Sequence, residues 1–398
     1  MKCEWKKVRL GDVISTNTSS YSPKEAWSFV NYLDTGNITE NIIDEIQAID
    51  LTAEKLPSRA KRKVKHNSIL YSTVRPNQRH YGIVKEQPEN FLVSTGFTVI
   101  DVNKKAVDAD FFYYLLTQDS YVELLHSIAE QSVSAYPSIK AADIENLEVD
   151  LPPLEIQKQI AAVLISLDGK IQGNRSINNN LEQQVLAIYT DKFIATDNPN
   201  RHTCRADEYF DVSIGKTPPR KEPQWFSTNP KDVTWVSISD MGACGIYINA
   251  SSEQLTQEAV NKHNVKIVPD NTVLLSFKLT VGRIAITDGE LTTNEAIAHF
   301  KTDNKAINEY LYCYLKRFNY RTMGSTSSIA TAVNSKIIKA MPFIVPTEDE
   351  LNEFHNIAAP MFRLIKTNQA EILRLSALRD TLLPKLMSGE LDVSNLDL

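Results

Sequence analysis

Apolar residues recur with the period of an α-helix in two stretches of the chain, one in the middle and one near the end. Each stretch follows prolines, Pro152 and Pro153 in the first case and Pro346 in the second, and a helix tolerates proline in its first turn. The pattern predicts two long helices with one apolar stripe each, the first rising about 50 Å at about 1.5 Å per residue. The stripe positions are Ile156, Ile160, Val163, Leu167, Ile171, Ile177, Leu181, Val185 and Ile188 in the first helix, and Ile357, Met361, Leu364, Ile372, Leu375, Leu378, Leu382 and Leu386 in the second.

A helix with one apolar stripe gains most of its stability from packing, so each long helix needs a partner. We expect the two to pair with each other in antiparallel orientation and to act as a rigid spacer between globular domains. Asn174 and Asn368 lie on the stripes near mid-helix. In an antiparallel pair they would meet in the seam, where a polar pair penalises slipped registers. The alternative is that one or both lie at the edge of the stripe, in contact with water.

The segments outside the helices occur twice, in the same order and about 200 residues apart. A period of this length is far too long for a solenoid, so we interpret it as a duplicated unit of domain plus helix. The paired motifs are 10–13 with 209–212, 32–38 with 235–241, 67–72 with 271–276, 111–116 with 309–315, and 147–152 with 341–346.

Short runs of β-branched and aromatic residues between polar turns, such as 96–100 and 265–268, indicate strands. The predicted fold class is therefore α+β with a pseudo-twofold internal repeat, in which a long antiparallel two-helix coiled coil separates two globular domains. The predicted boundaries are 1–152 for the first domain, 153–196 for the central helix, 197–346 for the second domain, and 347–398 for the distal helix and tail.

The composition is that of a folded globular protein, with 42% hydrophobic and 23% charged residues in a chain of 398. The 43 basic and 49 acidic residues give a net charge of −6, which excludes a uniformly basic coat for nucleic acid but leaves room for a local basic patch. No apolar run has the length of a membrane span, and no CxxC spacing links the four cysteines. We expect a cytoplasmic protein with reduced thiols and no membrane partner.

The sequence contains no recognisable catalytic or cofactor motif. It has no GxGxxG or GxxxxGK[ST] loop, no HExxH, and no Cys/His spacing for a metal. Residues 150–154, Asp-Leu-Pro-Pro-Leu, superficially resemble the Asp/Asn-Pro-Pro-aromatic pocket of adenine methyltransferases, but Leu154 lacks the ring that stacks a flipped base. We therefore expect no catalytic residue, no metal and no cofactor in this chain.

Basic residues gather in one segment of each domain. Eight lie between Arg59 and Lys85 with no acidic residue among them, and three surround Pro218 and Pro219. Such clusters attract phosphates and can read guanine, although an exposed, solvated loop gives the same pattern. Two serine-rich segments, which contain Ser134 and Ser327, have short hydroxyl side chains that allow a close approach to DNA. The alternative is that both are surface loops. The candidate DNA-binding residues are Lys61, Arg62, Lys63, Arg75, Arg79, His80, Tyr81, Ser134, Tyr136, Lys216, Arg220, Lys221, Lys278, Arg283 and Ser327.

Three motifs together resemble the specificity (S) subunits of Type I restriction-modification systems. The segment 151–171, beginning Leu-Pro-Pro-Leu-Glu-Ile-Gln, is similar to the opening of that family's central helix. The segment 378–391, Leu-Arg-Asp-Thr-Leu-Leu-Pro-Lys-Leu-Met-Ser-Gly-Glu-Leu, is similar to the family's closing signature, and 213–221 is similar to a stretch near the start of one recognition domain. The distal helix entry departs from the pattern, because 345–351 has one proline and no Gln-Lys.

The resemblance implies a non-catalytic subunit with two target-recognition domains that reads a split, asymmetric sequence in double-stranded DNA. Two modification subunits that use S-adenosylmethionine would dock on its helices and methylate adenine, and restriction subunits would complete an ATP-dependent nuclease. An enzyme in its own right would need a cofactor site that the chain lacks. The remaining alternative is a protein–protein adaptor with two binding units, which the salt dependence of DNA binding would distinguish.

Overall fold

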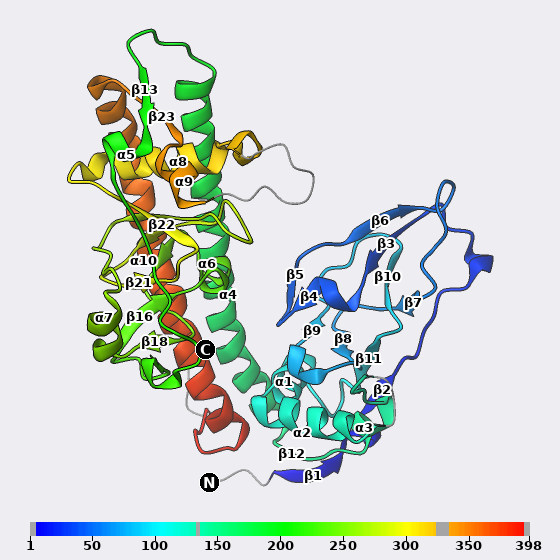
Figure 1. Ribbon diagram of the computed structural model, residues 1–398. Coiled ribbons are helices and arrows are strands. Elements are labelled where there is room, and N and C mark those ends of the chain that lie inside the picture. Colours follow the sequence, from blue (N-terminus) through cyan, green and yellow to red (C-terminus); the bar gives the residue numbers. More distant parts are fainter. Residues whose placement is uncertain (1–4, 133–135, 324–333, 394–398) are drawn as a thin grey trace. The chain divides into compact units, whose positions relative to one another are not determined.

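The computed structural model describes residues 5–132, 136–323 and 334–393. The chain forms two compact units, the first made of Met1–Lys170 with Leu375–Leu398 and the second of Ile171–Arg374. Ser134 and Ser327, two of the candidate DNA-binding residues, lie outside the described residues. Each unit combines small sheets with helices, which confirms the α+β class (Figure 1).

In the first unit, two four-stranded sheets form the globular part. One is antiparallel throughout, in the order β2(Ile14–Thr16)-β11(Phe97–Val102)-β8(Ile69–Ser72)-β9(Tyr81–Ile83). The other has the order β6(Gln47–Asp50)-β3(Phe29–Leu33)-β10(Phe91–Ser94)-β7(Ala60–Lys63), with β3 and β10 parallel. β1(Lys6–Arg9) pairs with β12(Glu148–Leu151), and β4(Ile38–Thr39) pairs with β5(Ile42–Ile43). The helices are α1(Ala109–Leu116), α2(Asp119–Glu130) and α3(Ala141–Glu145).

The second unit repeats this plan. Its larger sheet has the order β14(Asp211–Ile214)-β22(Ile297–Lys301)-β19(Val273–Ser276)-β20(Ile284–Thr287)-β17(Tyr247–Ile248). The smaller sheet has the order β15(Phe226–Ser227)-β18(Gln254–Leu255)-β16(Val233–Val236)-β21(Thr292–Thr293). β13(His202–Arg205) pairs with β23(Pro342–Val345). The short helices are α5(Ala206–Tyr209), α6(Ile238–Ala243), α7(Gln257–His263), α8(Asn308–Arg317) and α9(Ser335–Lys339).

The duplicated motifs fall on equivalent elements of the two units. Motif 67–72 leads into β8 and motif 271–276 into β19, and both begin with an asparagine in the left-handed region, with φ of 71° at Asn67 and 53° at Asn271. The aromatic motifs form α1 and α8, whose side chains are almost all buried. A tyrosine of each helix donates to a carboxylate of the long helix α4(Leu154–Tyr189): Tyr114 to Asp168 at 2.6 Å and Tyr312 to Glu182 at 2.7 Å. The internal repeat is therefore confirmed.

Two long helices begin where the prolines predicted. Helix α4 spans Leu154–Tyr189 and continues as a π-helical turn, Thr190–Ile194, and α10 spans Glu348–Met387. In the second unit they run antiparallel, because Asn178 contacts Asn368 whereas Lys192, further along α4, contacts Glu353, which lies earlier on α10. The helix segments of the first unit run antiparallel too, with Asp168 Oδ1 2.9 Å from Arg379 Nη1 and Ile160 in one core with Leu386.

Polar residues do enter the seam between α4 and α10, but with partners other than those predicted. Asn174 and Asn368 are buried, with 3% and 7% of their surfaces exposed. Asn368 Nδ2 donates to Asn178 Oδ1 at 2.8 Å, and Asn174 Nδ2 donates to Glu371 Oε2 at 2.8 Å. Both asparagines therefore lie in the seam as expected, but each donates to a residue about one helical turn from the expected partner. The water-exposed alternative is excluded by their burial.

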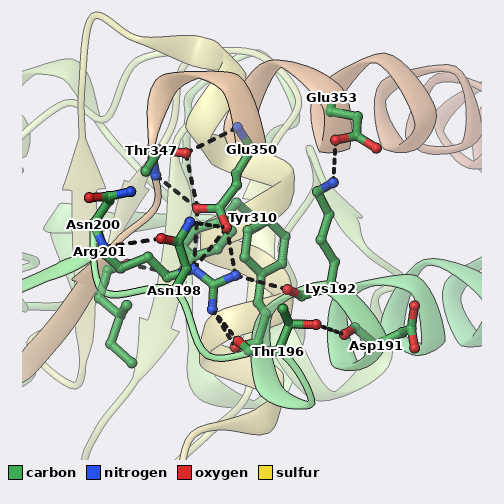
Figure 2. A network of polar contacts seen from close by, with 12 residues as sticks. Asp191, Lys192, Thr196, Asn198, Asn200, Arg201, Tyr310, Thr347, Glu350 and Glu353 are labelled. Atoms are coloured by element: carbon green, nitrogen blue, oxygen red, sulfur yellow. Dashed lines mark hydrogen bonds and ion pairs between the residues drawn. The ribbon is translucent and has the colours of Figure 1, made fainter.

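A buried ion pair joins the end of α4 to the start of α10 within the second unit. Arg201 Nη2 lies 2.7 Å from Glu350 Oε1, and only 8% and 16% of the two side chains are exposed. The guanidinium also donates to the backbone oxygens of Lys192, Phe193 and Thr196, which lie at the end of the π-helical turn. Glu350 accepts from the backbone and hydroxyl of Thr347 and so caps α10 (Figure 2). Arg201 therefore supplies hydrogen bonds to the unpaired carbonyls at the end of the π-helical turn and also to the Glu350 carboxylate.

One predicted strand is wrong. Residues 265–268 follow the left-handed Asn264, which ends α7, and only Val268 makes a β-bridge, to Leu291. Val265 and Val268 are buried whereas Ile267 is exposed. The segment is apolar because its valines fill the core beside α7 and β20, and burial without backbone pairing does not make a strand.

Candidate nucleic-acid interface

Carboxylates from other segments neutralise half of the acid-free basic cluster of the first unit. The sequence places eight basic residues between 59 and 85 with no acid, but the fold brings acids to four of them. The ion pairs are Lys63 with Glu25, Lys65 with Asp101 at 3.1 Å, Arg79 with Asp119 at 2.7 Å, and Lys85 with Asp110 at 2.6 Å. The charge of each of these four cations is therefore already balanced in part by a carboxylate of the protein.

Among the described residues, Arg59, Lys61, Arg62 and Arg75 form no ion pair. Lys61 and Arg59 are exposed, Lys61 on the edge strand β7. Arg62 is only half-exposed, and its Nε is buried without a hydrogen-bond partner. A buried N–H without a hydrogen-bond partner costs free energy, so Arg62 is the side chain of these four that the fold satisfies least.

Three turns of the first unit lie together and carry two of these arginines. The backbone N–H of Thr73 donates to Gly96 O at 2.8 Å, that of Thr95 to Arg59 O at 2.8 Å, and that of Arg75 to Pro137 O at 2.9 Å. The guanidinium of Arg75 lies 5.4 Å from the ring of Tyr136, which is 60% exposed. We call Arg59, 73–75, 95–96 and 136–137 the first turn cluster. It presents two cations and an aromatic ring to solvent.

His80 and Tyr81 serve the fold beside this cluster. His80 Nδ1 lies 2.7 Å from Ile38 O and 3.2 Å from Thr39 Oγ1. Tyr81 is buried and its ring stacks on Tyr71, with the centroids 5.7 Å apart. Burial raises the pKa of Tyr81. Since its ring faces the core, we leave Tyr81 out of the surface that could contact DNA.

The second unit builds the same turn after β19. The backbone N–H of Phe277 donates to Ala296 O at 2.9 Å, as that of Thr73 does to Gly96 O. Leu279 then has a φ of +57°, matching the +47° of Arg75. We call 277–283 with 294–296 the second turn cluster. Its tip is Leu279, whose side chain is 99% exposed.

The predicted cations of the second unit divide in the same way. Lys216 Nζ donates to His263 O at 2.6 Å, and Arg283 Nη1 donates to Ile238 O at 2.5 Å. Arg220 pairs with Glu253 at 2.9 Å and lies over the rings of Phe226 and Trp235. Lys221 and Lys278 are exposed and form no ion pair within the described ranges. Of the five predicted cations, these two are therefore available to a ligand without breaking an ion pair, although Lys278 Nζ lies 5.7 Å from the centroid of the Phe277 ring.

A pocket of the second unit lies beside α10, with a volume of about 370 Å³. Glu309, His355, Asp270 and Arg363 are among its lining residues. His355 Nδ1 is 3.0 Å from Glu309 Oε2, and burial raises the pKa of Glu309. No group of three or more His, Cys, Asp or Glu residues within the described ranges has the geometry to hold a metal ion. None of the described helices is both long and apolar enough to cross a bilayer.

Comparisons with known proteins agree with the repeat. Residues 2–183 and 203–377 match the family described as the Type I restriction modification DNA specificity domain, once in each half of the chain. The chain belongs to this family. The resemblance inferred from the helix-entry and closing motifs is therefore confirmed.

Relatives of the Type I specificity-domain family match nearly the whole chain. The "Type I restriction enzyme HindI specificity subunit" of Haemophilus influenzae is 25% identical, with 98% of this chain and all of that protein covered. The "Type I restriction enzyme MjaIX specificity subunit" of Methanocaldococcus jannaschii is also 25% identical, over 98% and 94%. The crystal structure of the S subunit of a Type-I system from M. genitalium has a TM-score of 0.59 at 15% identity, covering 97% and 96%, and so shares the fold.

For this member of the specificity-domain family, sequence reasoning missed Arg59 as a contact candidate and Leu279 entirely. Arg59 was counted in the basic cluster, but its place in the first turn cluster depends on a hydrogen bond to Thr95. Leu279 carries no charge, so the basic clusters of the sequence do not point to it. Aligning the duplicated motifs would have found it, because Ser72 corresponds to Ser276 and so Arg75 corresponds to Leu279.

Proposed function

We propose that this chain is the non-catalytic DNA-reading subunit of a cytoplasmic Type I restriction-modification complex. In this proposal residues 1–152 and 197–346 are two target-recognition domains, and each reads one half of a split, asymmetric DNA sequence. The observation that carries the proposal is the family match in both halves of the chain. The two turn clusters give it a surface, because each unit presents exposed side chains at the same turn.

The proposed contact set follows from which side chains are free. It consists of Arg59, Lys61 and Arg75 in the first domain and Lys221 and Lys278 in the second. Cations attract phosphates, and a flat guanidinium can also pair with guanine. The cations already paired with acids, such as Lys63 and Arg79, would instead hold the turns in place.

The proposed partners are two modification subunits, which would bind S-adenosylmethionine and methylate adenine, with restriction subunits joining through the complex. Residues 346–398 contain five basic and nine acidic residues, a net charge of −4. A negative distal helix favours contact with protein over contact with phosphate. The names of the relatives place those proteins in Type I restriction enzymes, which is consistent with this assembly.

Alanine substitution of Arg59 and Arg75 tests the DNA surface. The control pair is Lys104→Ala with Lys105→Ala. These exposed lysines lie just after the end of β11, whereas Gly96 lies just before its start, and the strand between them is about 20 Å long at about 3.3 Å per residue. Loss of a phosphate contact at Arg59 should lower the slope of log affinity against log salt by about 0.9. Loss of a guanine contact at Arg75 should weaken binding at every salt concentration. The measurement is the affinity for DNA of the chain assembled with its modification subunits. It is made between roughly 50 and 200 mM salt, the range over which binding through phosphate contacts weakens.

Equal slopes for both pairs would remove the first turn cluster from the DNA surface. Absence of any sequence-preferring DNA binding by the unaltered complex, or binding that does not weaken with salt, would favour the adaptor alternative. Mapping methylated adenines in cells that express the chain with its modification partner then gives the two half-sites directly. A continuous motif without a gap would contradict the division into two recognition domains.

A further inference from the structure

Unlike side chains stand at the same backbone position of the two turn clusters. Ser72 ends β8 and Ser276 ends β19, and three residues later come Arg75 and Leu279. Both are exposed and both adopt a left-handed backbone, with φ of +47° and +57°. The duplication has therefore kept the conformation of the tip while its chemistry differs.

Folding alone gives no reason for a leucine at this position. A left-handed backbone costs a bulky L-residue about 1–2 kcal/mol, which glycine or asparagine would largely avoid. Leu279 recovers none of this by burial, since 99% of its surface is exposed, more than for any other large hydrophobic residue in the described ranges. A single exposed apolar side chain is common at protein surfaces, but one that is held in a strained backbone conformation points to a functional contact.

The base of the loop holds Leu279 in a fixed place. Ser276 Oγ donates to Thr280 O at 2.6 Å and accepts from the backbone N–H of Arg283 at 3.0 Å. Gly282 has a φ of +95°, and the ring of Tyr320 lies 3.2 Å from where its Cβ would be. The loop therefore closes on itself and rests on an aromatic ring, so that only its tip projects into solvent.

We propose that Leu279 is a specificity-determining residue of the second domain and contacts the 5-methyl group of a thymine in the major groove. Arg75 would hold the equivalent place in the first domain and pair with a guanine. The chemistry follows from the side chains, because thymine is the base that presents an apolar group in that groove, whereas guanine presents two acceptors to a guanidinium. Lys278, exposed beside Leu279, would contact a neighbouring phosphate. This inference rests on the proposed function.

Leu279→Gly tests the contact without endangering the fold, because glycine relieves the left-handed backbone while removing the side chain. The control is Ile267→Ala, which removes another exposed apolar side chain of the second unit. We expect the Leu279→Gly complex to bind its target about five- to tenfold more weakly, the low end of the discrimination given by one base contact. Its thermal midpoint should be unchanged or higher. Ile267→Ala should bind as the unaltered protein does.

Deoxyuridine identifies the partner group, because it is thymidine without the methyl. Once methylated adenines have been mapped, each thymine of the second half-site is replaced in turn. One replacement should weaken binding by the unaltered complex about as much as Leu279→Gly does, and should have no further effect on that variant. Equal binding by Leu279→Gly, a uracil penalty that persists in the variant, or a second half-site without thymine would each overturn the inference. Failure of the proposed function is distinct: the unaltered complex would then show no methylated motif at all.

Discussion

Neutralising Glu350 is expected to weaken the junction between the end of α4 and the start of α10. Glu350→Gln keeps the size of the side chain and most of its hydrogen-bonding reach, but removes the charge that faces Arg201. Hydrogen bonding to Arg201, with smaller contributions from Asn198 and Thr347, holds the pKa of Glu350 at about 2 against an ordinary value of 4.5. The folded state therefore stabilises the ionised form of the Glu350 carboxyl more than the unfolded chain does.

The lowered pKa sets the size of the effect. A difference from 4.5 to about 2 corresponds to about 3.4 kcal/mol at about 1.4 kcal/mol per pKa unit. Because 16% of the Glu350 side chain remains exposed, solvent screening reduces this to about 2 kcal/mol. The pKa is depressed on folding, so the contribution is complete above pH 4.5 and is lost as the pH falls from 4.5 toward 2.

Urea unfolding of the second-unit signal measures this directly. At pH 7 the free energy of unfolding of Glu350→Gln should be lower by about 2 kcal/mol, and the gap between variant and unaltered protein should narrow at pH 3.5. The matched control is Glu353→Gln, which neutralises an exposed carboxylate one turn further along α10. An equal loss in both variants, or a Glu350→Gln gap that does not change between pH 7 and 3.5, would refute the assignment of the stability to the Arg201 contact.

Three further changes follow from buried or strained positions. Burial lowers the pKa of His299 to about 3, so the free energy of unfolding should fall by about 2 kcal/mol from pH 7 to pH 5 as the imidazole of the unfolded chain takes up a proton. In urea titrations His299→Gln should remove this pH dependence, whereas His202→Gln, at an exposed histidine, should not. Gly389 has a φ of +70° and would place a Cβ 3.1 Å from the Trp5 ring, so Gly389→Ala should cost about 1–2 kcal/mol; an unchanged thermal midpoint would contradict this. Replacing both Asn174 and Asn368 with leucine should raise the free energy of unfolding by about 1 kcal/mol, since their partners Glu371 and Asn178 can turn to water; a lower thermal midpoint would show that the amides are needed for stability.

The architecture could be predicted from the sequence because its signals are local or repeated. Prolines at 152, 153 and 346 mark the helix starts to within two residues, and the repeated motifs fall on equivalent elements. The seam partners could not be found in this way. Stripe periodicity places Asn368 on the inner face, but a shift of one turn keeps it there, and the choice of Asn178 as its partner depends on packing along the whole helix.

The candidate interface was less predictable, because charge in the sequence says nothing about what the fold brings beside it. Lys63 and Arg79 lie in a run without acids, yet Glu25 and Asp119 reach them from 38 and 40 residues away. Tyr81 lies in the same run and faces the core. A run of cations therefore overstates the free charge, and only the tertiary contacts separate a side chain that holds a turn from one that a ligand can use.

The two units divide their residues into those that build the turn and those that the turn presents. The builders are alike in both copies: a left-handed asparagine opens the central strand, a serine ends it, and a tyrosine fixes α1 or α8 to a carboxylate of α4. The presented residues, Arg75 and Leu279, differ in charge, shape and polarity. Because an exposed tip contributes little to the core, its identity can change at a cost of about 1 kcal/mol or less, whereas a change in a builder affects packing. A fold organised in this way can alter what each half recognises and leave the scaffold intact, which is the property that a reader of two unlike DNA half-sites requires.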